Sequence, residues 1–222
     1  MKKGFLVLAA AVLSLVLAVP APIEAAAPLP TAEVKEYEGV RLGSVKDFRE
    51  NSIRGVQKVD PATYRLVVDG LVNKPLSLGL EEVGKLPRSK KVVRIDCVEG
   101  WSVTALWEGF LVSDLLKLAG PKPAAKIVIF HAVDGYTTSL PLDTLLSKKI
   151  LLADHINGIV LPPANGYPFQ LVAEAKWGYK WIRWVNRVEL SDNLGYKGTW
   201  ERQGYSNKGD AEIGRASCRE RV

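Results

Sequence analysis

Hydrophobic and polar positions alternate in short runs along the middle of the chain, which is the pattern of half-buried strands. Tyr64–Gly70 alternates and ends in Asp-Gly, as a strand entering a turn does. Lys91–Cys97 is rich in β-branched residues and predicts a strand with Cys97 at its end, followed by a loop over Val98–Thr104. Leu151–Leu161 predicts a hairpin that turns at Asn157-Gly158. Further strands are predicted over Lys126–Ala132, Tyr136–Leu140, Phe169–Ala173 and Trp181–Leu190.

Three short segments carry helical signals instead. Leu111–Ala119 has leucines at helical spacing, and Gly120-Pro121 stops it. Ser77–Leu86 predicts a short helix ended by Pro87, and Asp143–Ser147 predicts another. Strands, short helices and long loops together predict a mixed α+β domain, and loops of this length are where functional residues commonly lie.

The N-terminal residues have the pattern of a targeting segment. Lys2-Lys3 is positive, Gly4–Val19 is uncharged and almost wholly apolar, and Pro20–Ala27 is rich in small residues. The apolar run is shorter than the roughly 20 residues that span a bilayer. Residues 1–25 are therefore interpreted as a signal peptide, with a retained N-terminal anchor that would associate with a membrane as the alternative. Either way the chain is expected to be exported, to the periplasm or another extracytoplasmic site.

The remaining chain divides into three parts. Residues 26–45 are polar and predict an extended leader, and residues 46–211 form the predicted domain. Residues 212–222, EIGRASCRERV, match the translation of a common sequencing-adapter read-through. They are interpreted as an artefact that replaces the native C-terminus after about Ala211. The alternative is a short disordered basic tail.

Charge and missing motifs exclude several classes of function. The formal net charge is +6, trimming both ends lowers it, and no long run of Lys and Arg occurs, so nucleic-acid binding is not expected. A Gly-rich phosphate loop, a His-Glu-x-x-His pair, a Cys-x-x-Cys pair and a Gly-x-Ser-x-Gly elbow are all missing from the sequence. The two histidines, His131 and His155, lie in apolar contexts and are expected to be structural.

Cys97 is the first candidate for chemistry. With Cys218 set aside as part of the tail, it is the only cysteine, so an exported chain could form no internal disulfide. A thiolate at a strand end would face a loop and suits metals that bind sulfur. The competing interpretation is a small buried hydrophobe, a common fate of a free cysteine.

Two further stretches combine groups that bind planar or anionic ligands. Lys176–Trp184 interleaves Lys180 and Arg183, which could meet an anion, with aromatic faces, although a strand with cations that reach solvent would look the same. Asn165–Gln170 places two amides around a rigid turn, and amides can read heterocycles because each has donors and an acceptor. Alone, this second stretch is only a turn.

Together these stretches resemble the molybdopterin-binding domain of the sulfite-oxidase superfamily. The resemblance covers about residues 47–210 and rests on Arg94–Ser102, Asp134–Tyr136, and Asn165–Gln170 followed by Lys176–Trp184. The Cys-Val-Glu-x-Trp-Ser form of the first block resembles the periplasmic methionine-sulfoxide reductase catalytic subunits more than the sulfite oxidases. The resemblance implies an α+β, mixed-sheet sulfite-oxidase-type fold with a molybdopterin cofactor (Mo-MPT).

The resemblance also implies roles for particular residues. Cys97 would ligate molybdenum, while Glu99, Trp101 and Tyr136 would line the substrate side. The pterin would be held by residues at positions similar to the family's contacts, with Lys180 beside its phosphate. These residues are Asn51, Ser52, Ile53, Ala132, Asn165, Gln170, Gly178, Tyr179 and Lys180.

Three departures from the family qualify these roles. Gln170 stands where much of the family has Arg, and the Arg-rich substrate pocket of sulfite oxidases is not evident. A dianion such as sulfite needs cationic donors, so sulfite is disfavoured as substrate. Lys2-Lys3 stands where a twin-arginine export signal is expected, which leaves the export route open.

The resulting hypothesis is a molybdenum-dependent oxidoreductase that transfers an oxygen atom on a small substrate such as a sulfoxide. Electrons would pass to or from a separate protein, a haem or membrane subunit. One alternative is an oxidase of the same fold that acts on sulfite or another inorganic sulfur species. The other is a non-catalytic binding module without cofactor.

Overall fold

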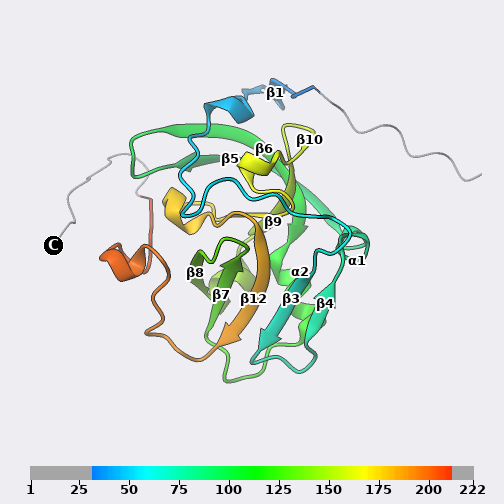
Figure 1. The fold of residues 1–222 in the computed structure, drawn as a ribbon, viewed down its shortest axis with the longest axis vertical. Coiled ribbons are helices and arrows are strands. Elements are labelled where there is room, and N and C mark those ends of the chain that lie inside the picture. Colours follow the sequence, from blue (N-terminus) through cyan, green and yellow to red (C-terminus); the bar gives the residue numbers. More distant parts are fainter. Residues whose placement is uncertain (1–31, 212–222) are drawn as a thin grey trace, which may run out of the picture.

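The structure is a computed structural model that describes residues 32–211 (Figure 1). The predicted signal peptide or anchor, the first residues of the leader and the adapter-like tail lie outside these residues. Within residues 32–211, none of the helices combines the length and the apolar character that crossing a bilayer requires. The fold consists of two five-stranded sheets, a small hairpin and a few short helices, which confirms the predicted mixed-sheet α+β class.

The first sheet carries the cysteine at the end of one of its strands. Its order is β10-β9-β6-β5, with β11 also paired to β9, and all its pairs are antiparallel. The long β5–β6 hairpin runs across the top of Figure 1. The strands are β5 (Arg88–Asp96), β6 (Ser102–Leu111), β9 (Leu151–Ile156), β10 (Ile159–Val160) and β11 (Gln170–Val172).

The second sheet is mixed and has the order β4-β3-β12-β7-β8. Only β12 and β3 are parallel in it, while the other neighbours are antiparallel. Its strands are β3 (Leu66–Gly70), β4 (Leu76–Leu78), β7 (Ile127–Ala132), β8 (Thr137–Pro141) and β12 (Val185–Ser191).

Short helices connect the strands. They are η1 (Val45–Asp47), α1 (Leu80–Gly84), α2 (Val112–Ala119), α3 (Leu142–Ser147), η2 (Pro163–Asn165), η3 (Gly178–Lys180) and η4 (Glu201–Gln203). Helix α2 ends before Gly120-Pro121 as predicted, and α3 confirms the helix expected from Asp143.

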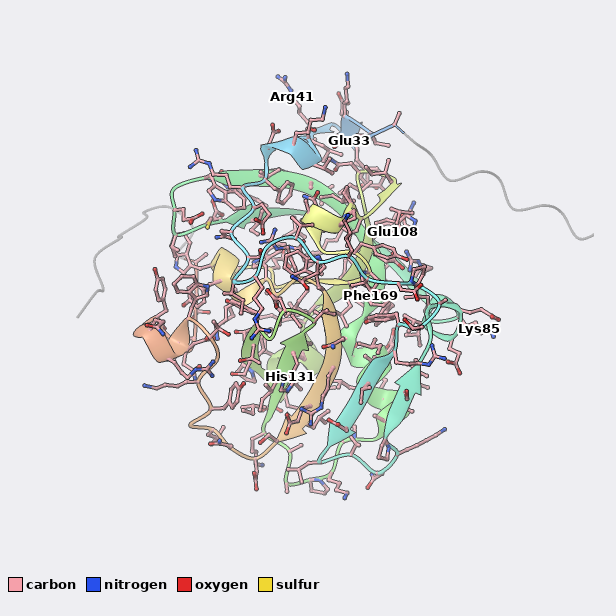
Figure 2. All side chains as sticks on the ribbon, viewed as in Figure 1. Glu33, Arg41, Lys85, Glu108, His131 and Phe169 are labelled. Atoms are coloured by element: carbon pink, nitrogen blue, oxygen red, sulfur yellow. The ribbon has the colours of Figure 1, made fainter. Side chains whose placement is uncertain are left out.

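The hydrophobic core joins the two sheets. Trp107 of β6, Phe110 of β6 and Phe169, just before β11, are at most 2% exposed and form part of it. Figure 2 shows Phe169 in the middle of the molecule, whereas Lys85 lies at its edge. Burying side chains of this size excludes water from a large apolar surface and stabilises the arrangement of the sheets.

The leader contacts the outer side of the first sheet. It contains the two-residue strands β1 (Glu36–Tyr37) and β2 (Val40–Arg41), drawn in blue at the top of Figure 1. Glu33 accepts hydrogen bonds from Asn157 Nδ2 at 3.0 Å and from the Val45 backbone N–H at 2.8 Å. Gly43 N–H donates to the Thr104 carbonyl of β6. These contacts fix the path of the segment that follows, which reaches the site described below.

Three predicted elements differ from the structure. The helix expected over Ser77–Leu86 is shorter, because Leu76–Leu78 pairs with β3 as a strand and only Leu80–Gly84 is helical. The loop expected over Val98–Thr104 ends earlier, because β6 already begins at Ser102. The strand expected from Trp181 begins at Val185, after η3.

Candidate functional site

One pocket gathers most of the residues that the sequence singled out. It has about 870 Å³ of free space, counted to its open mouth, and lies among the loop after β5, the η3–β12 stretch and segments near both ends of the described chain. Its walls combine aromatic side chains with a few polar groups, which is typical of pockets for cofactors and small molecules. Ten predicted site residues line it: Asn51, Ser52, Cys97, Glu99, Trp101, Tyr136, Asn165, Gln170, Gly178 and Tyr179.

A tight turn at the end of β5 presents Cys97 to the pocket. Asp96 pairs with Ser102 at the end of the hairpin, and the Cys97 N–H donates to the Trp101 carbonyl at 2.9 Å. The side chain is 6% exposed and lines the pocket. The sulfur is therefore buried, as the competing interpretation required, but it is buried at a cavity wall where a ligand could reach it.

The thiol of Cys97 is protonated in the absence of a metal. Burial raises its pKa, and the carboxylate of Glu99 raises it further, with Sγ 3.7 Å from Glu99 Oε2. A bound metal cation reverses this balance because it stabilises the thiolate as its ligand.

A chain of hydrogen bonds surrounds the sulfur. Glu99 Oε2 accepts from Trp101 Nε1 at 3.1 Å and from Asn51 Nδ2 at 3.3 Å. The other end of the Asn51 amide, Oδ1, accepts from Arg183 Nη2 at 3.2 Å. The network thus joins a carboxylate beside the sulfur to a cation in the opposite wall.

Arg183 is the buried cation of this pocket. Its side chain is 14% exposed, and its Nη1 donates to the Ala164 carbonyl at 2.8 Å. The guanidinium also lies 4.9 Å from the centre of the Trp184 ring and 3.6 Å from Glu50 Oε1. Burial lowers its pKa, while Glu50 opposes that change. A guanidinium remains charged in proteins, so it can receive an anionic group of a ligand.

Tyr136 links the start of β8 to η3. Its hydroxyl donates to the Tyr179 carbonyl at 2.6 Å, and its N–H donates to Asp134 Oδ1 at 2.9 Å. Burial raises the pKa of Tyr136 strongly, with smaller effects of Glu201 and other nearby groups in the same direction. Tyr136 therefore stays a neutral hydrogen-bonding group.

Two features of the pocket fit a large planar, polar ligand. The hydroxyl of Ser52 is buried and has no hydrogen-bond partner among the described residues. Gly178 packs directly against the cysteine, where a Cβ would make ordinary contacts of 3.4 Å with Cys97 Cα and 3.5 Å with the Asp96 carbonyl. Buried polar groups normally have partners, and an orphan in a pocket indicates a missing ligand atom or water. The amides of Asn165 and Gln170, 5% and 3% exposed, add further donors and acceptors.

Three predicted site residues do not line the pocket. Ile53 is 42% exposed, and Ala132 is buried at the end of β7. Lys180 is 0% exposed and pairs with Glu201 at 2.5 Å instead of facing the cavity. Of the two cations in this stretch, Arg183 and not Lys180 therefore lines the pocket.

Some lining residues lie outside the stretches that the sequence singled out: Phe48, Arg49, Trp200 and Tyr205. Others lie within those stretches but were not assigned as site residues: Ile95, Val98, Asp134, Trp181, Ile182 and Trp184. Phe48 packs edge-on against Trp101 with ring centres 6.0 Å apart. Trp200 and Tyr205 pack on each other at 5.4 Å. The only sequence signal for Trp200 and Tyr205 is that they are aromatic and follow the aromatic stretch that ends at Trp184. Their place in the pocket depends on the tertiary structure.

Both histidines contact carboxylates outside this pocket. His131 Nε2 lies 2.9 Å from Glu189, and His155 Nδ1 lies 2.7 Å from Asp154. Burial lowers the pKa of His131 against the opposing effect of Glu189. Their contacts agree with the structural role expected for them.

Comparison with known proteins matches most of the described chain. The family model described as the oxidoreductase molybdopterin binding domain matches residues 53–200. The uncharacterized oxidoreductase YuiH of Bacillus subtilis is 38% identical over 152 residues, which cover 68% of this chain and 76% of that protein.

Two further proteins match over about half of their own length. The protein-methionine-sulfoxide reductase catalytic subunit MsrP of Gluconobacter oxydans is 34% identical over 166 residues, which cover 63% of this chain and 53% of MsrP. The crystal structure of the sulfane dehydrogenase SoxCD of Paracoccus pantotrophus superposes with a TM-score of 0.61 at 26% identity. That match covers 67% of this chain and 42% of the SoxCD chain.

Proposed function

Because this chain belongs to the oxidoreductase molybdopterin-binding domain family, and is thus a molybdopterin-dependent oxidoreductase, we propose that it removes an oxygen atom from a small sulfoxide. The observation that carries this proposal is the sulfur of Cys97 at the wall of a pocket that Arg183 also lines, with Glu99 and Asn51 linking the two by hydrogen bonds. When bound, the cofactor supplies the redox chemistry of oxygen-atom transfer. The protein supplies binding, orientation and electrostatics.

The pocket residues divide the binding of the cofactor among them. Cys97 would ligate the metal, the close wall at Gly178 would admit the planar ring system, and Ser52 would gain a partner. Asn51, Asn165 and Gln170 offer amides, the Tyr179 segment closes the wall, and Arg183 offers the charge for a phosphate. Ile53, Ala132 and Lys180 would act on the cofactor only through their backbone or their neighbours.

The substrate side is expected to favour neutral molecules. Glu99 places a carboxylate 3.7 Å from the sulfur, and Trp101 contributes an aromatic face held by its bond to Glu99. A carboxylate here repels anions, while an aromatic wall accommodates the apolar groups of a sulfoxide. Tyr136 can hold a polar oxygen nearby as a neutral hydrogen-bonding group.

Electrons would come from a separate protein. The MsrP relative is named as a catalytic subunit, which supports a partner such as a haem or membrane subunit. We propose an extracytoplasmic site of action because the N-terminal sequence has the pattern of an export signal.

Native purification followed by metal and pterin analysis tests cofactor binding. We expect about one molybdenum per chain in the wild type. Cys97→Ser should lose turnover and the sulfur-to-metal absorption while its circular dichroism stays native. Cys218→Ser makes the same change at the chain's other cysteine and should keep both properties. A colourless wild-type protein without molybdenum, from cells that make the cofactor, would instead support a non-catalytic binding module.

Kinetics with two dyes tests the reaction. Reduced viologen with dimethyl sulfoxide measures reduction, and ferricyanide with sulfite measures oxidation. The proposal requires the first activity to exceed the second by at least about a hundredfold in kcat/KM. The reverse ratio would support the second candidate, an oxidase of inorganic sulfur. Two observations favour that candidate: Arg49 and Arg183 both line the pocket, and the SoxCD structure is a sulfane dehydrogenase.

A further inference from the structure

The segment from Gly198 to Asp210 lies against the pocket but has almost no regular structure. It follows β12 and contains only the one-turn η4. In Figure 1 it is the orange-red stretch on the side of the molecule where β8 and η3 lie. Trp200 and Tyr205 from this segment line the pocket, and Tyr205 also packs on Tyr179 with ring centres 5.2 Å apart. The segment therefore forms one wall. Apart from a single antiparallel bridge between Asp210 and Lys176, no sheet pairing among the described residues holds it.

A completely buried ion pair fastens this wall. Lys180 and Glu201 are 0% and 1% exposed, and Nζ lies 2.5 Å from Glu201 Oε1. Thr138 Oγ1 donates to the same oxygen at 2.7 Å, and Lys180 Nζ donates to the Ser139 carbonyl at 3.1 Å. The second oxygen of Glu201 is buried without a hydrogen-bond partner among residues 32–211. Lys180 therefore compensates most of the buried negative charge.

Weaker contacts surround this pair along the wall. Thr199 N–H donates to the Thr137 carbonyl at 2.8 Å, and Tyr179 Oη donates to the Ser206 carbonyl at 2.7 Å. At the far end Lys176 pairs with Asp210, whose side chain is 61% exposed. Exposed pairs contribute little, whereas removing one partner of a buried pair is strongly destabilising. The attachment thus depends mainly on Lys180 and Glu201.

We propose that residues 198–210 are a wall of the pocket that the Lys180–Glu201 pair holds closed, which makes these two residues positioning residues for substrate binding. The effect on substrate binding rests on the function proposed above. The attachment of the wall by the ion pair is independent of that function. Glu201 and Tyr205 lie beyond the residues 53–200 that match the family model, so most of this wall lies outside that match.

Glycine at position 198 offers a test that leaves both charges in place. A Cβ there would lie 2.4 Å from the Thr137 carbonyl oxygen and 2.5 Å from Glu201 Oε2, so Gly198→Ala is incompatible with the closed wall. Gly195→Ala is its matched control, because a Cβ at position 195 meets only Asn193 Oδ1, at 3.4 Å.

Hydrogen exchange on the cofactor-loaded full chain measures the attachment directly. In Glu201→Gln, amide protection in residues 198–211 should fall by about a hundredfold or more, while β6 and β9 keep theirs. Gly198→Ala should show the same local loss. Asp210→Asn makes the same carboxylate-to-amide change at an exposed pair and should alter protection less than about fivefold. Unchanged protection in 198–211, or an equal loss throughout the domain, overturns the proposal.

Substrate discrimination measures the consequence. The ratio of kcat/KM for methyl phenyl sulfoxide to that for dimethyl sulfoxide should rise about tenfold in Trp200→Ala and in Glu201→Gln, because an open wall admits the larger group. A locally open segment with an unchanged ratio overturns the positioning role. If the wild type reduces neither sulfoxide, the proposed function fails, and hydrogen exchange still decides whether the pair holds the wall.

Discussion

Lys180 and Arg183 are three residues apart, yet they lie in two different regions of the molecule. Lys180 is buried and pairs with Glu201 of the 198–210 wall, while Arg183 lines the pocket and contacts Asn51 and Glu50. Burial lowers the pKa of both cations, and a carboxylate opposes that change in each case. The two charges differ in the partner open to them: Lys180 is neutralised by Glu201 inside the protein, whereas Arg183 can contact a ligand in the pocket.

The comparison shows that the contacts around a lysine or arginine, and not its place in a candidate binding motif, decide whether it can bind a ligand. A buried charge must have a partner, and a partner supplied by the protein leaves nothing for a ligand. A guanidinium with several donors can bond to the protein and still present donors to a cavity. Substitutions at the two positions should therefore separate stability from ligand binding.

The largest expected effect is on stability at position 180. Lys180→Met leaves Glu201 buried without a cation, so we expect the free energy of unfolding to fall by about 3–5 kcal/mol in urea titrations. The double variant Lys180→Met with Glu201→Leu removes both charges and should recover most of that loss. A single variant that loses less than about 1 kcal/mol would contradict the contrast drawn here.

Substitution of Arg183 should weaken cofactor binding more than it lowers stability. Arg183→Met removes a charged donor facing the pocket, so the retention of molybdopterin during gel filtration should fall about tenfold or more, corresponding to roughly 1.4 kcal/mol. Its free energy of unfolding should fall by only about 1–2 kcal/mol. Arg202→Met is the control, since Arg202 is an exposed arginine that also donates to a carbonyl. Equal cofactor retention in both variants would refute the role of Arg183.

The smallest expected effect sharpens the electrostatics around Arg183. Burial raises the pKa of Glu50, but the hydrogen bond from the Ser52 backbone N–H and the charge of Arg183 lower it more, so its net pKa is depressed. A depressed folded-state pKa stabilises the fold above the unfolded-state pKa, and this contribution is lost as pH falls through the folded-state value. Glu50→Gln should therefore differ from wild type by less than about 1 kcal/mol at neutral pH and by nothing in strong acid. Urea titrations across this pH range measure it, and a difference that grows on acidification would be inconsistent with this pairing.

Most strands were predictable from alternation or from a run of β-branched residues, but β6 and β4 were not. Leu66–Gly70 and Ile127–Ala132 were expected within a few residues of their observed bounds. Ser102–Leu111 was not, because β6 is paired on both sides and Ala105, Leu106 and Trp107 are all buried, which removes the alternation. Leu76–Leu78 was taken for helix because its strand character depends on pairing with β3.

The site was predictable from residues that stand next to strand ends and turns. The sequence singled out Cys97 because it stands at the end of a strand, whereas Asn165 and Gln170 gained a role only through the resemblance to the family. It could not separate Lys180 from Arg183, because their spacing alone does not show that Glu201 reaches one of them. Phe48, Arg49 and Tyr205 come from segments whose local pattern has no link to the pocket, so only their tertiary placement reveals them.

The pocket draws on both ends of the described chain, and this has a practical consequence. Residues 53–200 contain both five-stranded sheets and the cysteine, so a chain trimmed to that range would keep the hydrophobic interior. It would lose Asn51, Ser52 and Tyr205 from the pocket, and Lys180 would be left without its counter-ion, Glu201. The smallest piece worth expressing is thus set by what encloses the cavity, and not by what fills the core.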